Sequence, residues 1–258
     1  FDYNVINLLI FSNLLIIFTI LKIKISVQVS ISYIFFFLLI VFFWKYLKKN
    51  FFNTQNIIYF IFFYLVLFIL SIDIAYNLTL GWDAQSTWFP RVISFYNDEY
   101  LTEVSKYARH PEYPIFGSLS WAFFWKFFYI DKEYFGRFFY LLIFLISIFN
   151  FIDLLRISLI KKIIISLSLI LLIYDYWHFR GYQEILIFSF ILIISKYLYF
   201  IICEKKTDKE FLFIILIASN LIIWTKNEGI FFSFFIYLIL SIFSKYNIKI
   251  KVINFTLF

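Results

Sequence analysis

An acid and several aromatic side chains interrupt an otherwise apolar chain at residues 81–90, GWDAQSTWFP. Asp83 lies here between Trp82 and Trp88. A carboxylate that has lost part of its water shell to aromatic neighbours can act as a general base and take a proton from a reacting hydroxyl group. The alternative is a solvated acid at a membrane surface, with its Trp neighbours in the aromatic belt. On local sequence alone, the solvated acid is the simpler interpretation.

A second polar segment is RHPEYP, residues 109–114, in which His110 and Tyr113 stand among two prolines. Proline fixes φ and pushes the residue before it into extended geometry, so this segment is expected to be stiff. His110 could be a metal ligand, an acid or a hydrogen-bonded side chain, and one histidine does not decide between these roles. The alternative for the whole segment is an ordinary turn that leads into an apolar helix.

A third segment, WHFRGYQE at residues 177–184, carries Arg180 and Glu184 just before an apolar run. An ionisable group at a membrane boundary is costly to bury and tends to be paired or functional. The alternative is a helix-start acid that is favoured by the helix dipole. The sequence supports both interpretations of Glu184 equally.

A fourth segment, TKNEG at residues 225–229, places Lys226 and Glu228 between two apolar runs. Lys226 is predicted to contact an anion such as a phosphate, and Arg137 is expected to be a second cation at the same face. The alternative is a tight turn in which Lys226 and Glu228 neutralise one another.

The elements that carry these residues are expected to be membrane-spanning helices. The chain has 258 residues, of which 64% are hydrophobic, and a mean hydropathy of +0.90, whereas a soluble domain is nearer half apolar. In lipid every backbone N–H and C=O has to be paired within its own segment, so each apolar run should form a helix. The sequence therefore predicts an all-α integral membrane protein with about eight spans, at residues 5–21, 30–45, 57–75, 138–154, 163–176, 185–202, 211–225 and 230–244.

Charge and cysteine content exclude other classes of protein. The formal net charge is +7, but Lys and Arg gather at the ends of apolar runs, and no Gly-rich phosphate loop or nucleic-acid motif is present. No nucleic-acid partner is expected. Cys203, the single cysteine, excludes an internal disulfide. Because the sequence contains no Met, we interpret residues 1–258 as a single membrane domain truncated at both ends.

The distribution of positive charge decides how the segment 115–130 is interpreted. If it lies flat as an interfacial helix within a large loop at 77–137, four basic stretches fall on one side of the membrane, which is then the cytoplasm. These stretches are KYLKK (45–49), RISLIKK (156–162), EKKTDK (204–209) and KYNIKIK (245–251). The 77–137 loop and the turns near 180 and 227 then share the extracytoplasmic face, although Lys22 and Lys24 fall on the unexpected side.

The order of the motifs GWDA, HPEYP, GYQE and TKNEG resembles that of the membrane-embedded GT-C glycosyltransferases over residues 57–245. The resemblance is greatest to the bacterial relatives of dolichyl-phosphate-mannose–protein mannosyltransferases and to aminoarabinose lipid A transferases. It implies a GT-C-like fold with the catalytic site outside the cytoplasm, in a bacterial inner membrane. It also implies an inverting transfer of a sugar from a polyprenyl-phosphate donor to a lipid, glycan or protein acceptor.

The resemblance assigns roles to particular residues. Asp83 and Glu184 correspond to the catalytic acids, whereas Arg137, Lys226, His110, Tyr113, Arg180, Trp82 and Glu228 are expected to bind substrates. Many relatives have Asp where Glu184 stands, and this departure leaves the presence of a shared divalent metal open. YPIF replaces the YPPL of relatives, and three spans instead of one precede the acidic loop.

Two other classes of function compete with the enzyme. A transporter or flippase for a lipid-linked sugar should keep its polar residues near the middle of the bilayer, in broken helices or repeated halves. The sequence instead places its polar residues at one face and shows no repeat, which favours the enzyme. A non-catalytic assembly subunit, whose polar loop binds a partner, is the third candidate.

Overall fold

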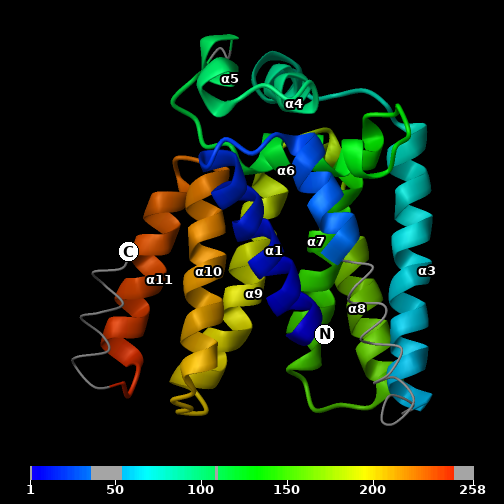
Figure 1. The fold of residues 1–258 in the computed structure, drawn as a ribbon. Coiled ribbons are helices and arrows are strands. Elements are labelled where there is room, and N and C mark those ends of the chain that lie inside the picture. Colours follow the sequence, from blue (N-terminus) through cyan, green and yellow to red (C-terminus); the bar gives the residue numbers. More distant parts are fainter. Residues whose placement is uncertain (1, 36–53, 108–109, 247–258) are drawn as a thin grey trace.

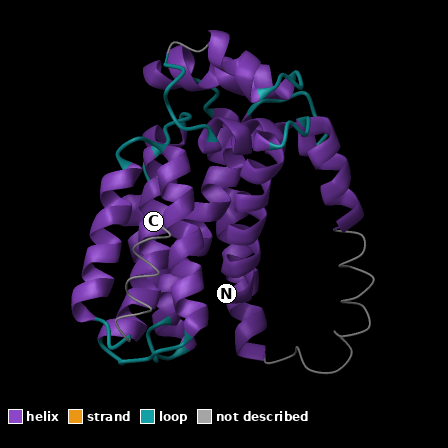
Figure 2. Cartoon of the chain, turned by 60° about the vertical axis from the view of Figure 1, so that its left-hand side comes forward, coloured by secondary structure: helices purple, strands orange, loops and turns teal. Residues whose placement is uncertain are grey.

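Long apolar runs fold as helices in the computed structural model, which describes residues 2–35, 54–107 and 110–246. Within these ranges the chain is all-helical and has no strand (Figure 2). The basic stretch 45–49, part of the expected span 30–45 and most of 245–251 lie outside the described residues. The long helices are α1 (Asp2–Ile20), α3 (Thr54–Tyr76), α7 (Tyr134–Asp153), α8 (Leu159–Ile173), α9 (Glu184–Ile202), α10 (Lys209–Thr225) and α11 (Gly229–Phe243), with a further helical segment at 25–35.

Among the residues that the structure describes, three helices are long and apolar enough to cross a membrane, at Ile57–Tyr76, Tyr134–Asp153 and Glu184–Ile202. They differ in how much of each helix the rest of the protein covers. In the most apolar stretch of Tyr134–Asp153, 78% of the residues are buried, whereas in that of Ile57–Tyr76 only 22% of the residues are buried. Helix α7 is therefore the centre of the bundle and packs on α9, α6 and α3. Helix α3 lies at the edge, where its Phe and Ile side chains are exposed, as expected for a surface that faces lipid.

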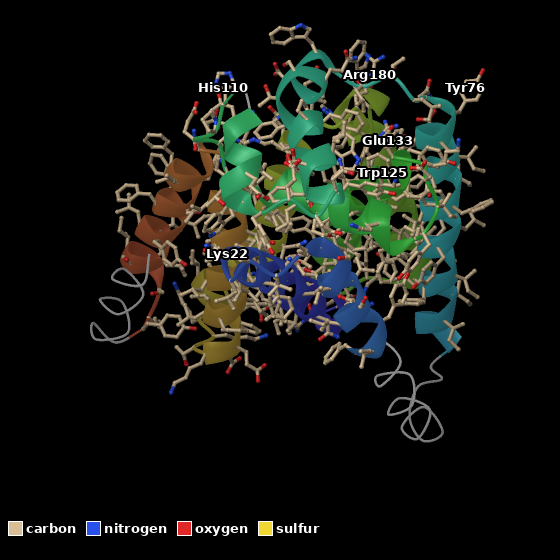
Figure 3. All side chains as sticks on the ribbon, turned by 45° about the horizontal axis from the view of Figure 1, so that its top comes forward. Lys22, Tyr76, His110, Trp125, Glu133 and Arg180 are labelled. Atoms are coloured by element: carbon tan, nitrogen blue, oxygen red, sulfur yellow. The ribbon has the colours of Figure 1, made fainter. Side chains whose placement is uncertain are left out.

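Short helices cover one end of the bundle (Figure 1). They are a π-helical turn at Ala84–Trp88, α4 (Phe89–Tyr96), α5 (Leu101–Tyr107) and α6 (Phe116–Phe127). The starts of α7 and α9 and the turn between α10 and α11 lie at this same end, which we call the capped end. The labelled side chains of Tyr76, His110, Glu133 and Arg180 also lie there (Figure 3).

Helix α6 occupies the middle of the segment 115–130 and has 12 residues, about 18 Å at 1.5 Å per residue. It is too short to cross a bilayer core of about 30 Å. All its residues from Phe116 to Phe123 are buried, because α4 packs on it and α1, α7 and α10 also contact it. An amphipathic helix lying half in lipid was expected, but α6 is enclosed by protein.

Candidate functional site

Four of the predicted site residues come together at the capped end. Lys226 directly follows α10, and its Nζ lies 2.5 Å from Oε1 of Glu184, the first residue of α9. The charges of Glu228 and Asp83 also act on Lys226. Residues from three separate turns therefore form one cluster, which we call the acid–lysine cluster: Asp83, Glu184, Lys226 and Glu228.

The acid–lysine cluster stabilises the charged form of its lysine. Burial disfavours a buried ammonium ion and acts to lower the pKa of Lys226. The hydrogen bond and charge of Glu184, together with the charges of Glu228 and Asp83, outweigh this effect, so the pKa of Lys226 is raised. All three acids are exposed, and their carboxylates can therefore be reached from outside the protein.

Close packing between two turns fixes the position of Asp83. The N–H of Gly81 donates a hydrogen bond to the carbonyl oxygen of Arg180 at 2.9 Å. A side chain at position 81 would overlap the ring of Tyr182, since an added Cβ would lie 2.4 Å from its Cζ. Gly181 adopts a φ of +91°, which favours glycine. The glycines of GWDA and GYQE thus allow the turns that carry Asp83 and Glu184 to touch.

The backbone around Asp83 is unusual. The π-helical turn Ala84–Trp88 begins directly after it, and single π turns inside helices often occur at functional sites. The expected desolvation of Asp83 by both Trp residues is not observed. Trp82 is 67% exposed and Trp88 only 3%, because one ring points outward while the other packs inward against Tyr113. The buried Trp88 ring is therefore not available to stack on a sugar, whereas the Trp82 side chain is exposed.

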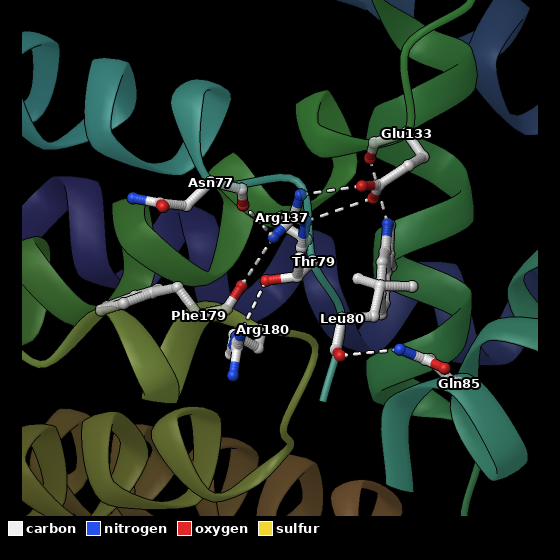
Figure 4. A network of polar contacts seen from close by, with 9 residues as sticks. Asn77, Thr79, Leu80, Gln85, Glu133, Arg137, Phe179 and Arg180 are labelled. Atoms are coloured by element: carbon white, nitrogen blue, oxygen red, sulfur yellow. Dashed lines mark hydrogen bonds and ion pairs between the residues drawn. The ribbon is translucent and has the colours of Figure 1, made fainter. Parts of the chain in front are cut away.

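Arg137 lies in a structural position and not at an exposed face. Its side chain is fully buried and forms a two-pronged ion pair with Glu133, with Nη2–Oε1 at 2.8 Å and Nε–Oε2 at 3.2 Å. Its Nη1 donates to the carbonyl oxygens of Phe179 at 3.2 Å and Asn77 at 3.5 Å (Figure 4). The guanidinium is thus held by one carboxylate and two backbone carbonyl oxygens, and it ties the end of α3 to the turn before α9. We therefore correct the expectation that Arg137 contacts a phosphate.

Glu133, the partner of Arg137, was not identified from the sequence. Burial raises the pKa of Glu133, and the opposing charge and hydrogen bonds of Arg137 only partly offset this effect. The four-residue spacing of Glu133 and Arg137 at the start of a helix is the signal that could have revealed the pair. The pair holds together the loop before α7, the end of α3 and the turn before α9.

Arg91 is a second buried arginine that sequence reasoning missed. It donates to the carbonyl oxygens of Tyr113 at 2.7 Å, Pro114 at 3.2 Å and His110. The stiff segment 110–114 therefore folds around one guanidinium, whose planar donors suit several acceptors. The His110 ring stacks on Tyr113, with centroids 4.8 Å apart.

The side chain of His110 has an acidic partner. Its Nδ1 lies 3.2 Å from Oε1 of Glu112, and both side chains are largely exposed. A backbone hydrogen bond, then the hydrogen bond and charge of His110, lower the pKa of Glu112. The pair belongs to the segment held by Arg91, and no contact between it and the acid–lysine cluster is described.

Arg180 lies at the rim of the capped end. Its guanidinium stacks on the Trp177 ring at 3.8 Å. It also donates to the hydroxyl of Thr79 at 2.5 Å (Figure 4). Trp177 is 56% exposed. This combination of an arginine and an exposed indole is typical of the headgroup level of a bilayer.

The cluster does not supply a set of metal ligands. Among residues 2–35, 54–107 and 110–246, no group of three His, Cys, Asp or Glu side chains could hold a metal ion. Glu184 already has Lys226 as its partner, and a cation beside a carboxylate opposes metal binding at that carboxylate. The side chains present therefore do not fit the divalent metal that the resemblance left open.

A second polar network lies inside the bundle and was missed in the sequence. Oδ1 of Asp2 accepts hydrogen bonds from Lys196 at 2.6 Å, Tyr197 at 2.9 Å and Asn150 at 2.9 Å. Lys196 is only 2% exposed. It lies 12 residues after Glu184 on α9, about 18 Å along the axis. We had expected the polar residues to lie at one face only, and this second network shows that they do not.

Comparison with known proteins adds no assignment, because no family model, curated protein or solved structure matches this chain. The acid–lysine cluster combines an exposed carboxylate that can accept a proton with a lysine that can neutralise an anion, held by turns that are packed together.

Proposed function

We propose that the chain transfers a sugar from a polyprenyl-phosphate donor to a hydroxyl-bearing acceptor at the capped end. The observation that carries this proposal is the meeting of Asp83, Glu184, Lys226 and Glu228 from three turns. A donor anchored by its lipid tail has its phosphate confined to the membrane surface. The charged group that meets it should then lie at the end of a helical bundle, as Lys226 does.

The proposed step inverts the configuration at the anomeric carbon of the sugar. The acceptor oxygen attacks the anomeric carbon, and Asp83 takes the proton of the acceptor hydroxyl. The bond between the anomeric carbon and the phosphate oxygen breaks, and its electron pair leaves with the lipid phosphate. Lys226 neutralises the charge that develops on this phosphate. Trp82 can stack on the sugar ring, and Arg180 with Trp177 lies where a headgroup would be.

The proposal includes a topology in which the capped end faces away from the cytoplasm of a bacterial inner membrane. Three spans meet the criteria of length and hydropathy, and we propose that the shorter apolar helices cross as well, to give eight. Helices α8, α10 and α11 have 15 to 17 residues, or about 22–26 Å. They would cross with local thinning of the bilayer.

Transfer by the purified protein is the direct test. A panel of polyprenyl-phosphate sugars would be offered in detergent or in vesicles with hydroxyl-bearing lipid, glycan and peptide acceptors. The expected result is release of the free polyprenyl phosphate, with the sugar recovered on an acceptor or on water. Failure with every donor, by protein that is folded and membrane-inserted, would contradict the proposal.

One observation favours a second function, the transport of a lipid-linked sugar. The network of Asp2, Asn150, Lys196 and Tyr197 places the buried ammonium group of Lys196 inside the bundle, paired with an Asp2 side chain that is 49% exposed. Ionisable residues inside a membrane bundle often mark a substrate or proton pathway. A flippase would move a fluorescent polyprenyl-phosphate sugar across proteoliposomes without cleaving it. Movement without cleavage would support this second function over the enzyme.

A further inference from the structure

The acid–lysine cluster carries a net negative charge. It holds three carboxylates and one ammonium ion, so that with every group ionised two negative charges remain. A lipid phosphate approaching Lys226 would meet this excess of negative charge. The lysine that should attract the phosphate is already neutralised by an ion pair of 2.5 Å.

The ion pair is built so that only one of its partners can move readily. The Lys226 side chain is 20% exposed, whereas that of Glu184 is 55% exposed. The backbone before Glu184 is fixed, because Gln183 is buried and its Nε2 donates to the Tyr140 hydroxyl at 3.0 Å. Rotation of the Glu184 side chain therefore exposes Lys226 without moving α9 or α10.

We propose that Glu184 is an internal counter-ion that occupies Lys226 in the resting protein and is displaced by the phosphate of the lipid-linked donor. This inference rests on the proposed function for the identity of the anion. It assigns Glu184 a regulatory role in place of a catalytic one. The anion exchanges for a carboxylate of similar charge, so Lys226 keeps a negative partner in both states.

The consequence of this exchange is selectivity. A weakly bound anion would not displace a carboxylate that is hydrogen-bonded to Lys226 and tethered to the same protein. A donor whose tail holds it at the membrane surface has a high effective concentration there and can compete. Soluble phosphates should therefore bind much more weakly than a polyprenyl phosphate of the same charge.

The test measures binding of a short-chain polyprenyl phosphate that carries no sugar, so that the result does not depend on transfer. Glu184→Gln removes the competing charge and should tighten binding about two- to fivefold, the range of a partly exposed ion pair. Glu112→Gln is the matched control, because it removes one negative charge from an exposed acid at the same capped end, in another loop, whose ion-pair partner is His110 and not Lys226. It should leave binding unchanged.

A double-mutant cycle identifies the lysine as the site of competition. With Lys226→Ala in the background, Glu184→Gln should no longer tighten binding, since nothing is left to compete for. Glu184→Ala provides a second removal of the charge, and it should give the same gain even if the amide of Gln rebinds Lys226. Binding of inorganic phosphate is measured in parallel, and it should be much weaker than binding of polyprenyl phosphate if the lipid tail is needed to displace Glu184.

Three results would overturn the inference. Equal or weaker polyprenyl phosphate binding by both Glu184 variants would mean that the carboxylate does not compete. A gain that persists in the Lys226→Ala background would place the competition elsewhere. Absence of polyprenyl phosphate binding by parent and variants alike would show that a lipid phosphate is not the anion that displaces Glu184. Tighter binding without sugar transfer from any donor would keep the counter-ion role while rejecting the transferase.

Discussion

At the scale of single residues, exposure separates the groups that could react from the groups that hold the fold. Asp83 and Glu184 are exposed, whereas Arg91 and Arg137 are buried and satisfied largely by backbone carbonyl oxygens or by Glu133. The sequence alone could not tell the exposed charged residues from the buried ones, because both kinds stand in similar polar motifs between apolar runs. A buried arginine that loses its partners leaves an uncompensated charge, so such residues stabilise loops strongly.

The first prediction concerns Asp83→Asn. Asn keeps the size of Asp but cannot accept a proton in the transition state, so sugar transfer should fall by at least about a hundredfold. Because the side chain is exposed, thermal stability should change by no more than about half a kcal/mol. Transfer is measured at saturating donor, and the unfolding midpoint is measured in the same detergent.

Asp131→Asn is the matched control, since Asp131 is also an exposed Asp of the loop region at the capped end. It should transfer sugar at the parent rate. An Asp83→Asn protein that is as active as this control would refute the role of base and support the solvated surface acid.

The second prediction concerns pH and Lys226. The pKa of Lys226 is raised above the ordinary lysine value of 10.5, so its charge, and its contribution to stability, persist below that value. Both are lost only as the pH rises through the higher folded-state pKa. Polyprenyl phosphate binding by Lys226 should therefore be constant from about pH 8 to 10 and decline above 10.5.

Lys226→Arg tests the sign of this effect, because arginine stays protonated in proteins. Its binding should show less decline over the same alkaline range. If the parent and Lys226→Arg decline together, another group controls the alkaline limb and Lys226 is not the phosphate contact.

At the scale of elements, hydrophobic length predicted the helices well but not how they pack. Expected spans at 57–75 and 185–202 correspond to α3 (Thr54–Tyr76) and α9 (Glu184–Ile202), because an apolar run ends where polar residues return the chain to water. The short helices α4 and α5 were not predicted, since their patterns are brief and lie in a polar loop. The burial of α6 depends on contacts from α1 and α10, which no local pattern contains.

The third prediction concerns the contact of α6 with the start of α9. A Cβ added at Gly117 would lie 1.2 Å from Oε1 of the buried Gln183, so Gly117→Ala forces this side chain away from Tyr140. Overpacking of this kind costs about 1–3 kcal/mol. The free energy of unfolding should fall by that amount, as measured by thermal or denaturant unfolding in detergent.

Gln183→Ala should rescue Gly117→Ala, because it removes the atoms that the new methyl group meets. On its own it should cost about 1 kcal/mol through the lost hydrogen bond to Tyr140. The double variant should be clearly more stable than the sum of the two single losses implies. Strict additivity would show that α6 and α9 do not meet through these residues.

At the scale of the whole molecule, the two polar regions lie at different heights in one helical bundle. The acid–lysine cluster joins turns at the capped end, and the network of Asp2 and Lys196 links residues 194 positions apart within the helices. The first could be predicted in outline, because motifs at the ends of successive spans return to the same face. The second could not, since it depends on which helices become neighbours.

The last prediction concerns the orientation of the bundle in the membrane. If α6 does not cross, Glu112 and His178 share one side and Cys203 lies on the other, since α9 runs from the capped end to the opposite end. All three residues are exposed. In right-side-out vesicles, a membrane-impermeant thiol reagent should leave the native Cys203 unlabelled until the membrane is opened. In a Cys203→Ser background, Glu112→Cys and His178→Cys should both label without opening it. Labelling of these two positions from opposite sides would mean that the segment 115–130 crosses the bilayer, and it would separate Asp83, His110 and Tyr113 from Glu184, Lys226 and Glu228 by the thickness of the membrane.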